Sequence, residues 1–286
     1  MKNSASVQFL YGTAPGRILL KGIQQLHLDR IAVWFLRSSL SKAIIPWYIR
    51  TNQIPMERYQ EQKFGSFRDF FLREKKNYTF DADPEHLISP CDGFLSVFPV
   101  EENQGFSLKG SYYRVQDLIH DPETAALFTG GQCLVFRLCA SDYHHYCYID
   151  DGNLKKSGFI EGKLHSVQPI ACETYPVFSL NRRAWSLLQT VHFGPVVQTE
   201  IGALVVGGIV NNQTEGTFSR GEKKGRFELS GSTIVLFLQK GAISLRPEIL
   251  KILKQQPEAR VELGMWIGSR LCSEPSEERV PCHKER

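Results

Sequence analysis

A Gly-Ser-Thr triplet, Gly231-Ser232-Thr233, interrupts an otherwise strand-like stretch near the C-terminal end of the sequence. The apolar run from Ile234 to Leu238 follows it, is bounded by polar residues, and is typical of a buried strand. Because glycine tolerates backbone conformations closed to other residues, the carbonyl of Gly231 can be presented to the hydroxyl of Ser232. The triplet therefore predicts either a reaction of the chain on itself or an ordinary turn.

A second group of reactive side chains lies in residues 142–152, which read Asp-Tyr-His-His-Tyr-Cys-Tyr-Ile-Asp-Asp-Gly. In a strand, His144 and His145 would point to opposite faces, so only one can face a common site, and we select His144. Cys147 could act as a base only if nearby positive charge lowered the pKa of its thiol from about 8.5. Otherwise it is a small buried apolar residue. Asp92 lies in a Ser-Pro-Cys-Asp-Gly sequence that also fits a turn.

The elements that would position these residues are mainly short strands separated by Gly, Asn and Asp. Strands are predicted at 93–100, 132–139, 144–150, 190–197, 201–210 and 233–238. Helices are predicted near 113–128 and 246–255, and Pro247 suits the first turn of the second. We expect an α+β fold, with a β-rich core of mostly antiparallel strands and amphipathic helices at the N-terminus.

The N-terminal region has a different pattern. Residues 1–16 are polar and are expected to be a mobile start, and the next segment carries apolar residues at helical spacing, with Pro46 expected to end or kink the helix. The apolar stripe comprises Leu36, Leu40, Ala43, Ile44 and Trp47, and the nearby basic residues are Arg30, Arg37, Lys42 and Arg50. Such a helix either packs on the protein's own core or lies in a membrane interface.

Ser66 is predicted to cap a short helix whose apolar side is formed by Phe67, Phe70 and Phe71. We expect these aromatic residues to be structural. The change from helical to strand-like pattern divides the chain into an N-terminal helical segment, residues 1–75, and a β-rich catalytic domain, residues 76–286. The polar tail after Cys272 is expected to be disordered.

The composition of the chain excludes several classes of function. The chain of 286 residues is 42% hydrophobic and 22% charged, which is enough to bury a full core. Its formal charge of +4 is modest, so we expect no dedicated nucleic-acid binding. The 7 cysteines have no regular spacing, which predicts a reducing compartment and no metal centre. We expect no secretory signal and no membrane-spanning helix, because no apolar run approaches about 20 residues.

Five stretches of the sequence, in order, resemble signature segments of the pyruvoyl-dependent phosphatidylserine decarboxylase proenzymes. They are residues 64–73 (Phe-Gly-Ser-Phe-Arg-Asp-Phe-Phe-Leu-Arg), 89–93 (Ser-Pro-Cys-Asp-Gly), 142–152, 201–209 (Ile-Gly-Ala-Leu-Val-Val-Gly-Gly-Ile) and 220–233, which ends in Gly-Ser-Thr. The resemblance as a whole extends over about residues 64 to 268. Several ordered segments are far more specific than the triplet alone.

The resemblance implies that the chain cuts itself between Gly231 and Ser232. The Ser232 hydroxyl attacks the Gly231 carbonyl and exchanges the amide for an ester. Elimination then breaks the ester, and hydrolysis of the resulting dehydroalanine leaves ammonia and a pyruvoyl group at the new N-terminus. The cofactor would be this pyruvoyl group, derived from Ser232. Residues 1–231 and 232–286 would form a heterodimer, and a homodimer of such heterodimers is left open.

By the same resemblance, Asp92 and His144 join Ser232 as catalytic residues, and His144 protonates or positions the substrate. The sequence departs from the commoner family pattern at Cys147, where many members have a second histidine that serves as the base in cleavage. It shares this form with a bacterial branch of the family. Cys147 and His145 are therefore the candidates for that base.

The implied substrate is phosphatidylserine, which must be lifted from a membrane surface, so a peripheral position on the cytoplasmic side of the cell membrane is expected. Lys109, Arg182 and Arg183 are candidate donors to its phosphate. Two alternatives remain open: a Cys/His hydrolase using Cys147, and a non-catalytic membrane-associated homologue.

Overall fold

The computed structural model describes residues 5–25, 28–108, 111–139, 141–203, 208–229 and 232–271. Its largest element is an eight-stranded sheet in the order β11-β7-β8-β9-β13-β5-β2-β15, in which every pair of neighbours is antiparallel. The strands are β2 (Gly93–Pro99), β5 (Gln132–Leu138), β7 (Gly152–Ile160), β8 (Arg183–Thr190), β9 (Pro195–Ile201), β11 (Gly216–Phe218), β13 (Ser232–Leu238) and β15 (Ala259–Val261). The expected α+β fold with a β-rich core is confirmed.

Strand β13 lies between β9 and β5, and all of its residues are buried. Because side chains alternate along a strand, β13 contributes to the cores on both faces of the sheet. Ile234 and Leu236 belong to a first core, whereas Val235 and Phe237 belong to a second. Ser232 has the parity of Ile234, so its side chain faces the first core.

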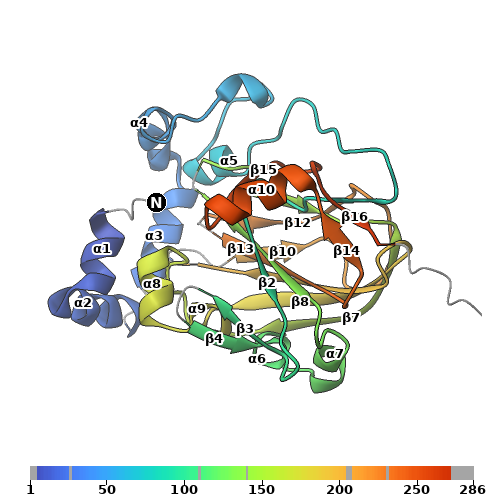
Figure 1. Cartoon of the computed structure of the whole chain (residues 1–286). Coiled ribbons are helices and arrows are strands. Elements are labelled where there is room, and N and C mark those ends of the chain that lie inside the picture. The colour runs from blue at the N-terminus through green and yellow to red at the C-terminus, as the bar shows by residue number, and fades with distance from the viewer. Residues whose placement is uncertain are drawn as a thin grey trace, which may run out of the picture.

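Two smaller sheets and several helices cover the first core. The sheets are β10-β12-β6, made of β10 (Gly208–Asn211), β12 (Lys223–Glu228) and β6 (His145–Cys147), and β1-β16-β14, made of β1 (His86–Ile88), β16 (Trp266–Arg270) and β14 (Ile243–Leu245). The helices include α5 (Phe67–Phe71) and α10 (Pro247–Gln255), which lie toward the top in Figure 1. Phe70, Phe227 and Ile249 show the contribution of α5, β12 and α10 to this core.

The second core is covered by the β3–β4 hairpin and by helices from the N-terminal end and the middle of the chain (Figure 1). These elements are β3 (Gly105–Leu108), β4 (Ser111–Arg114), α1 (Ala5–Gly12), α2 (Ala14–Gln25), α6 (Val115–Ile119), α7 (Pro122–Ala126), α8 (Pro169–Thr174) and α9 (Val177–Leu180). Tyr11 of α1 is 1% exposed, and its hydroxyl accepts a hydrogen bond from Ser166 N at 2.8 Å. The expected mobile start is therefore wrong for residues 5–16.

The remaining N-terminal elements are α3 (Leu28–Arg37), the 3-10 helices η1 (Ser39–Ile44) and η2 (Met56–Arg58), and α4 (Ile45–Thr51). The expected break lies just before Pro46: η1 ends at Ile44, α4 begins at Ile45, and Pro46 sits in the first turn of α4, where proline is tolerated. The expected cap at Ser66 is confirmed, since its side chain accepts from Asp69 N at 3.2 Å. In the described part of the chain, no helix combines the length and apolar character needed to cross a bilayer.

Several predicted boundaries are wrong for local reasons. The strand expected at 190–197 is interrupted at 191–194 by the turn between β8 and β9, where Thr190 N donates to Gly194 O and Gly194 has φ of +69°, whereas 195–197 lie in β9. The helix expected near 113–128 is broken because His120 adopts a left-handed conformation, and Pro122 begins the next helix. The strand predicted at 201–210 ends at Ile201, and β10 begins at Gly208. The tail after Cys272 lies outside the described residues.

Candidate functional site

Ser232 is the first residue of β13 and lies opposite Leu138 of β5. It is 1% exposed, and among the described residues its Oγ has no hydrogen-bond partner. A buried hydroxyl without a partner carries an energetic cost and needs an explanation, such as a reactive role. Gly231 lies outside the described residues, so the expected cleavage site is seen only from the Ser232 side.

Asp92 ends the loop between β1 and β2, and it is 5% exposed. Its Oδ1 accepts from Lys75 Nζ and Leu263 N, both at 2.8 Å, and its Oδ2 accepts from Tyr143 N at 3.3 Å. These three donors fix the position of the Asp92 side chain. The bond to Tyr143 also joins the 89–93 segment to the residue that precedes His144.

His144 is fully buried and is held from three sides. Its Nδ1 lies 2.9 Å from Asp142 O, its ring centroid lies 4.2 Å from that of Phe71, and its carbonyl accepts from Phe227 N at 2.9 Å. A carbonyl oxygen can only accept, so Nδ1 carries the proton and Nε2 carries the lone pair of the neutral ring. This tautomer makes Nε2 the atom that can take up a proton.

The other two reactive residues of this segment have different surroundings. The His145 ring stacks on Tyr143 at 4.6 Å, its Nε2 lies 3.4 Å from Leu72 O, and burial lowers its pKa to about 4. Cys147 is 1% exposed, and burial raises the pKa of its thiol to about 12. A thiol with this pKa stays protonated at neutral pH, which argues against Cys147 as a base or nucleophile.

The candidate phosphate donors have partners within the protein. Arg183 is buried and donates to backbone carbonyls, including Leu118 O at 2.6 Å and Asn181 O at 2.9 Å. Arg183 is paired with Ile201 of β9, which is paired with Thr233 of β13, so these three side chains point to the same face of the sheet. Because neighbouring residues of a strand alternate, Ser232 points to the other face. Arg182 pairs with Glu161 at 2.8 Å on the surface. Lys109 lies outside the described residues.

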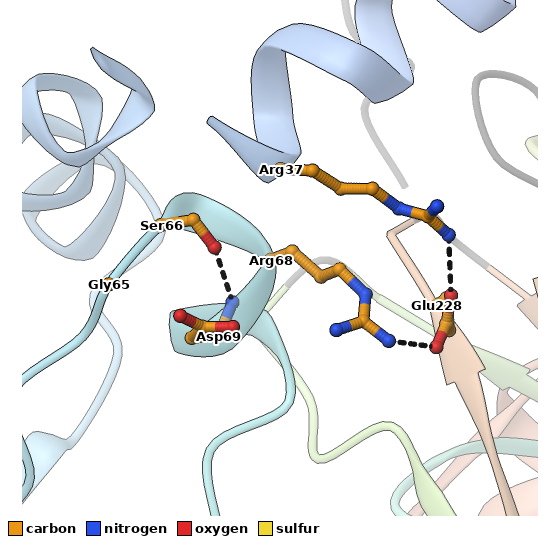
Figure 2. A pocket seen from close by; sticks show the side chains of 6 residues that line it. All are labelled: Arg37, Gly65, Ser66, Arg68, Asp69 and Glu228. Carbon is orange, nitrogen blue, oxygen red and sulfur yellow. Dashed lines mark hydrogen bonds and ion pairs between the residues drawn. The ribbon is translucent and has the colours of Figure 1, made fainter. Parts of the chain in front are cut away.

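A pocket of about 450 Å³ was not expected from the sequence. Its lining residues are Arg37, Gly65, Ser66, Arg68, Asp69 and Glu228. Figure 2 shows Arg37 from α3 and Arg68 from α5 reaching toward Glu228, at the end of β12. Arg68 belongs to the 64–73 segment, but its aromatic neighbours dominate the helical pattern there. Arg37 and Glu228 are too distant in sequence for any spacing to connect them.

A fully buried ion pair lies on the same side of the large sheet as Ser232. Lys224 Nζ lies 2.8 Å from Glu200 Oε1, and both side chains have 0% exposure. Gln198 and Asn211 donate to the same carboxylate at 3.0 and 3.2 Å. Glu200 is paired with Ile234, the next residue of β13 that faces the first core after Ser232. This polar network therefore lies beside the start of β13.

Comparison with known proteins identifies the family. A family model described as phosphatidylserine decarboxylase matches residues 67–269. Phosphatidylserine decarboxylase proenzyme 2 of Clostridium acetobutylicum is 38% identical over 268 residues, which are 93% of this chain and 92% of that protein. The phosphatidylserine decarboxylase proenzyme of Clostridium kluyveri is 38% identical, over 86% of this chain and 86% of that protein. The proenzyme of Desulfitobacterium hafniense is 32% identical, over 92% of this chain and 91% of that protein.

The match to the family model includes Asp92, His144 and Ser232, all three of which are buried. It also spans the large sheet and the smaller sheets that cover the first core. The chain therefore belongs to the phosphatidylserine decarboxylase family of carboxy-lyases.

Proposed function

We propose that this chain is a proenzyme that cuts itself between Gly231 and Ser232 and then decarboxylates phosphatidylserine to phosphatidylethanolamine and CO2. The observation that carries the proposal is the buried Ser232 hydroxyl, which has no hydrogen-bond partner among the described residues and stands at the start of a central strand. Its face of the sheet is the one covered by α5, β6 and β12, the elements that hold His144.

For the self-cleavage, Ser232 Oγ attacks the Gly231 carbonyl and gives up its proton to a base. We assign this base as His144 Nε2, because Nδ1 is bound to a carbonyl and the imidazole is the residue of this segment with a suitable lone pair. Cys147 is disfavoured by its raised pKa, and His145 by its lowered one. Asp92 supports the segment that carries His144 through its bond to Tyr143 N.

The surroundings of Ser232 fit the pyruvoyl group that its conversion would leave, since the strand start is buried and no described residue bonds to the hydroxyl. When present, this group supplies an electron sink for the charge left as CO2 departs. The protein's contribution is to exclude water around Ser232 and to hold His144 where Nε2 can return a proton to the substrate carbon.

We also propose that the substrate is taken from a membrane surface by the N-terminal helices. Exposed apolar side chains gather there: Ile31, Trp34, Leu40 and Trp47 are 62%, 69%, 69% and 63% exposed. Arg37 and Lys42 lie on the same segment. Exposed tryptophan beside basic residues is typical of a helix lying in a headgroup layer, and the proposed location is the cytoplasmic side of the cell membrane.

The test of the function is decarboxylation itself. Purified protein should release CO2 from phosphatidylserine in mixed micelles, and Ser232→Ala should abolish release. A hydrolase using Cys147 would instead lose activity on Cys147→Ser and keep it in Ser232→Ala. A non-catalytic homologue would release no CO2 in any form.

A further inference from the structure

We propose that Arg37 and Arg68 form a binding site for the phosphodiester of the lipid substrate, with Glu228 as an internal counter-anion that holds the two guanidinium groups ready. This inference rests on the proposed function for the identity of the ligand. Its physical basis is the pocket between α3, α5 and the end of β12 (Figure 2).

Three arginine side chains converge on Glu228, and the carboxylate of Asp69 also lines the pocket. Arg37 Nη2 lies 3.2 Å from Glu228 Oε2, Arg68 binds the other carboxylate oxygen, and Arg226 lies 3.8 Å from Glu228. Burial on its own would raise the pKa of Glu228, but the bond from Arg68 and the nearby arginine charges outweigh it and lower the pKa. The carboxylate is therefore ionised, and three guanidinium groups share it. Figure 2 shows the Asp69 carboxylate apart from them.

The arginines retain donors for another anion. Each guanidinium has five N–H groups in a fixed fork that matches phosphate oxygens. The Nε of Arg68 is buried and has no hydrogen-bond partner among the described residues. Arg37 is 54% exposed, so its ion pair with Glu228 adds little to stability by itself. Stabilisation of the fold therefore does not account for this convergence of charge, whereas anion binding does.

The pocket adjoins the proposed reaction centre through two elements. On α5, Arg68 is one helical turn from Phe71, which packs against the His144 ring. On β12, Glu228 follows Phe227, whose N–H binds the His144 carbonyl, and Leu229 then turns the chain with φ of +55° before Ser232. Two of the elements that line the pocket, α5 and β12, are therefore the same two that contact His144.

A phosphate pocket on the elements that contact His144 suits the chemistry of phosphatidylserine. Only an oxygen and a methylene separate its phosphorus from the carbon that carries the amine and carboxylate. The α3 helix that supplies Arg37 also exposes Ile31 and Trp34, which fits acyl chains continuing toward a lipid surface.

The test uses Arg68→Gln and Arg37→Gln in the full chain, with Arg114→Gln as the matched control. Arg114 is also an exposed arginine paired with a carboxylate, Asp117, but it lies on the β4–α6 side of the molecule. Short-chain phosphatidylserine is the substrate. Short-chain phosphatidylethanolamine, which keeps the phosphodiester and lacks the carboxylate, is the competing ligand, with its binding also measured by calorimetry.

We expect intact-mass spectrometry to show that each pocket variant cuts itself as the wild type does. Each variant should raise KM about tenfold, with a smaller change in kcat, and should weaken phosphatidylethanolamine binding by a similar factor. The control should match the wild type. Unchanged phosphatidylethanolamine binding in both variants overturns the proposal, since the pocket would then bind the serine carboxylate or nothing. A second result would also overturn the proposal. If millimolar inorganic phosphate competes with the substrate, and the pocket variants abolish this competition but leave lipid binding unchanged, the pocket is a site for free phosphate. If the wild type neither splits nor decarboxylates, the proposed function fails, whereas the calorimetry still decides the pocket.

Discussion

At Ser232 and His144, burial and hydrogen bonding specify roles that residue types alone leave open. The Gly-Ser-Thr triplet fits a turn as well as a nucleophile, and it is the buried Ser232 hydroxyl without a described partner that favours reaction. Strand alternation indicates that only one of His144 and His145 can face the site but does not decide which. The bond from His144 Nδ1 to Asp142 O leaves Nε2 as the His144 atom that can take up a proton. The raised pKa of Cys147 depends on its surroundings, which no local sequence pattern contains.

One prediction at this scale concerns the base. We expect His144→Gln to stay unsplit or to split at least about 100-fold more slowly, because general-base catalysis typically contributes that much or more. Cys147→Ser should still split. Gel electrophoresis of freshly purified protein followed over time gives both rates. If a His144→Gln chain splits fully but releases no CO2, the role of this residue is limited to protonating the substrate. The base for cleavage would then be another residue, such as His145 or Cys147.

At the scale of elements, the strand containing Ser232 and the capped helix at Ser66 were predictable because each has a strong local pattern. The β8–β9 hairpin was misplaced, since its turn residues Val191 to Gly194 include a valine and a phenylalanine that look strand-like. The pocket of Arg37, Arg68 and Glu228 was not predictable, because tertiary packing joins three distant segments.

The buried pair between β9 and β12 gives a prediction for stability. Lys224→Met leaves Glu200 as an unpaired buried charge and should lower the unfolding free energy by about 3–5 kcal/mol. Adding Glu200→Gln should recover part of that loss, because the remaining amide is neutral. Urea unfolding in the Ser232→Ala background keeps every sample as one covalent chain. A double variant less stable than Lys224→Met alone would show that the carboxylate is needed for its bonds to Gln198 and Asn211.

For the whole molecule, the family and the α+β class were accessible from the sequence, whereas the packing of the N-terminal helices was not. Ile45 and Phe70 share a core with Leu134 of the large sheet, and Tyr11 is buried against His165 and Tyr175. The boundary proposed at residue 75 therefore marks a change of secondary structure rather than a gap in packing. Deleting residues 1–50 would remove part of the core, so it is a poor test of membrane binding.

Membrane binding is better tested by exposed side chains. We expect Trp34→Ser with Trp47→Ser to reduce cosedimentation with anionic vesicles about tenfold or more, because these indoles are exposed and would enter the interface. Phe159→Ser, an exposed aromatic on β7, serves as the control. Equal binding of the double variant and the wild type would place the membrane contact elsewhere.

Two histidines predict the pH dependence of stability. Burial lowers the pKa of His145 and of His165 to about 4, against about 6.5 in an unfolded chain. The unfolded state therefore takes up protons first, and stability is complete above about pH 6.5 and falls as the pH drops toward 4. Each histidine should contribute about 1–3 kcal/mol to this loss. Thermal unfolding between pH 7 and 5 should show a falling Tm with a smaller slope in His165→Gln; a constant or rising Tm would contradict both assignments.

The central claim is that Ser232 is the residue at which this chain cuts itself, and the mass of the purified protein tests it most directly. Intact-mass spectrometry should resolve two fragments, residues 1–231 and residues 232–286, the second with a pyruvoyl group in place of its N-terminal serine. Ser232→Ala should give one full-length mass. A wild-type chain that remains whole, or a Ser232→Ala chain that splits at the same bond, would contradict the account.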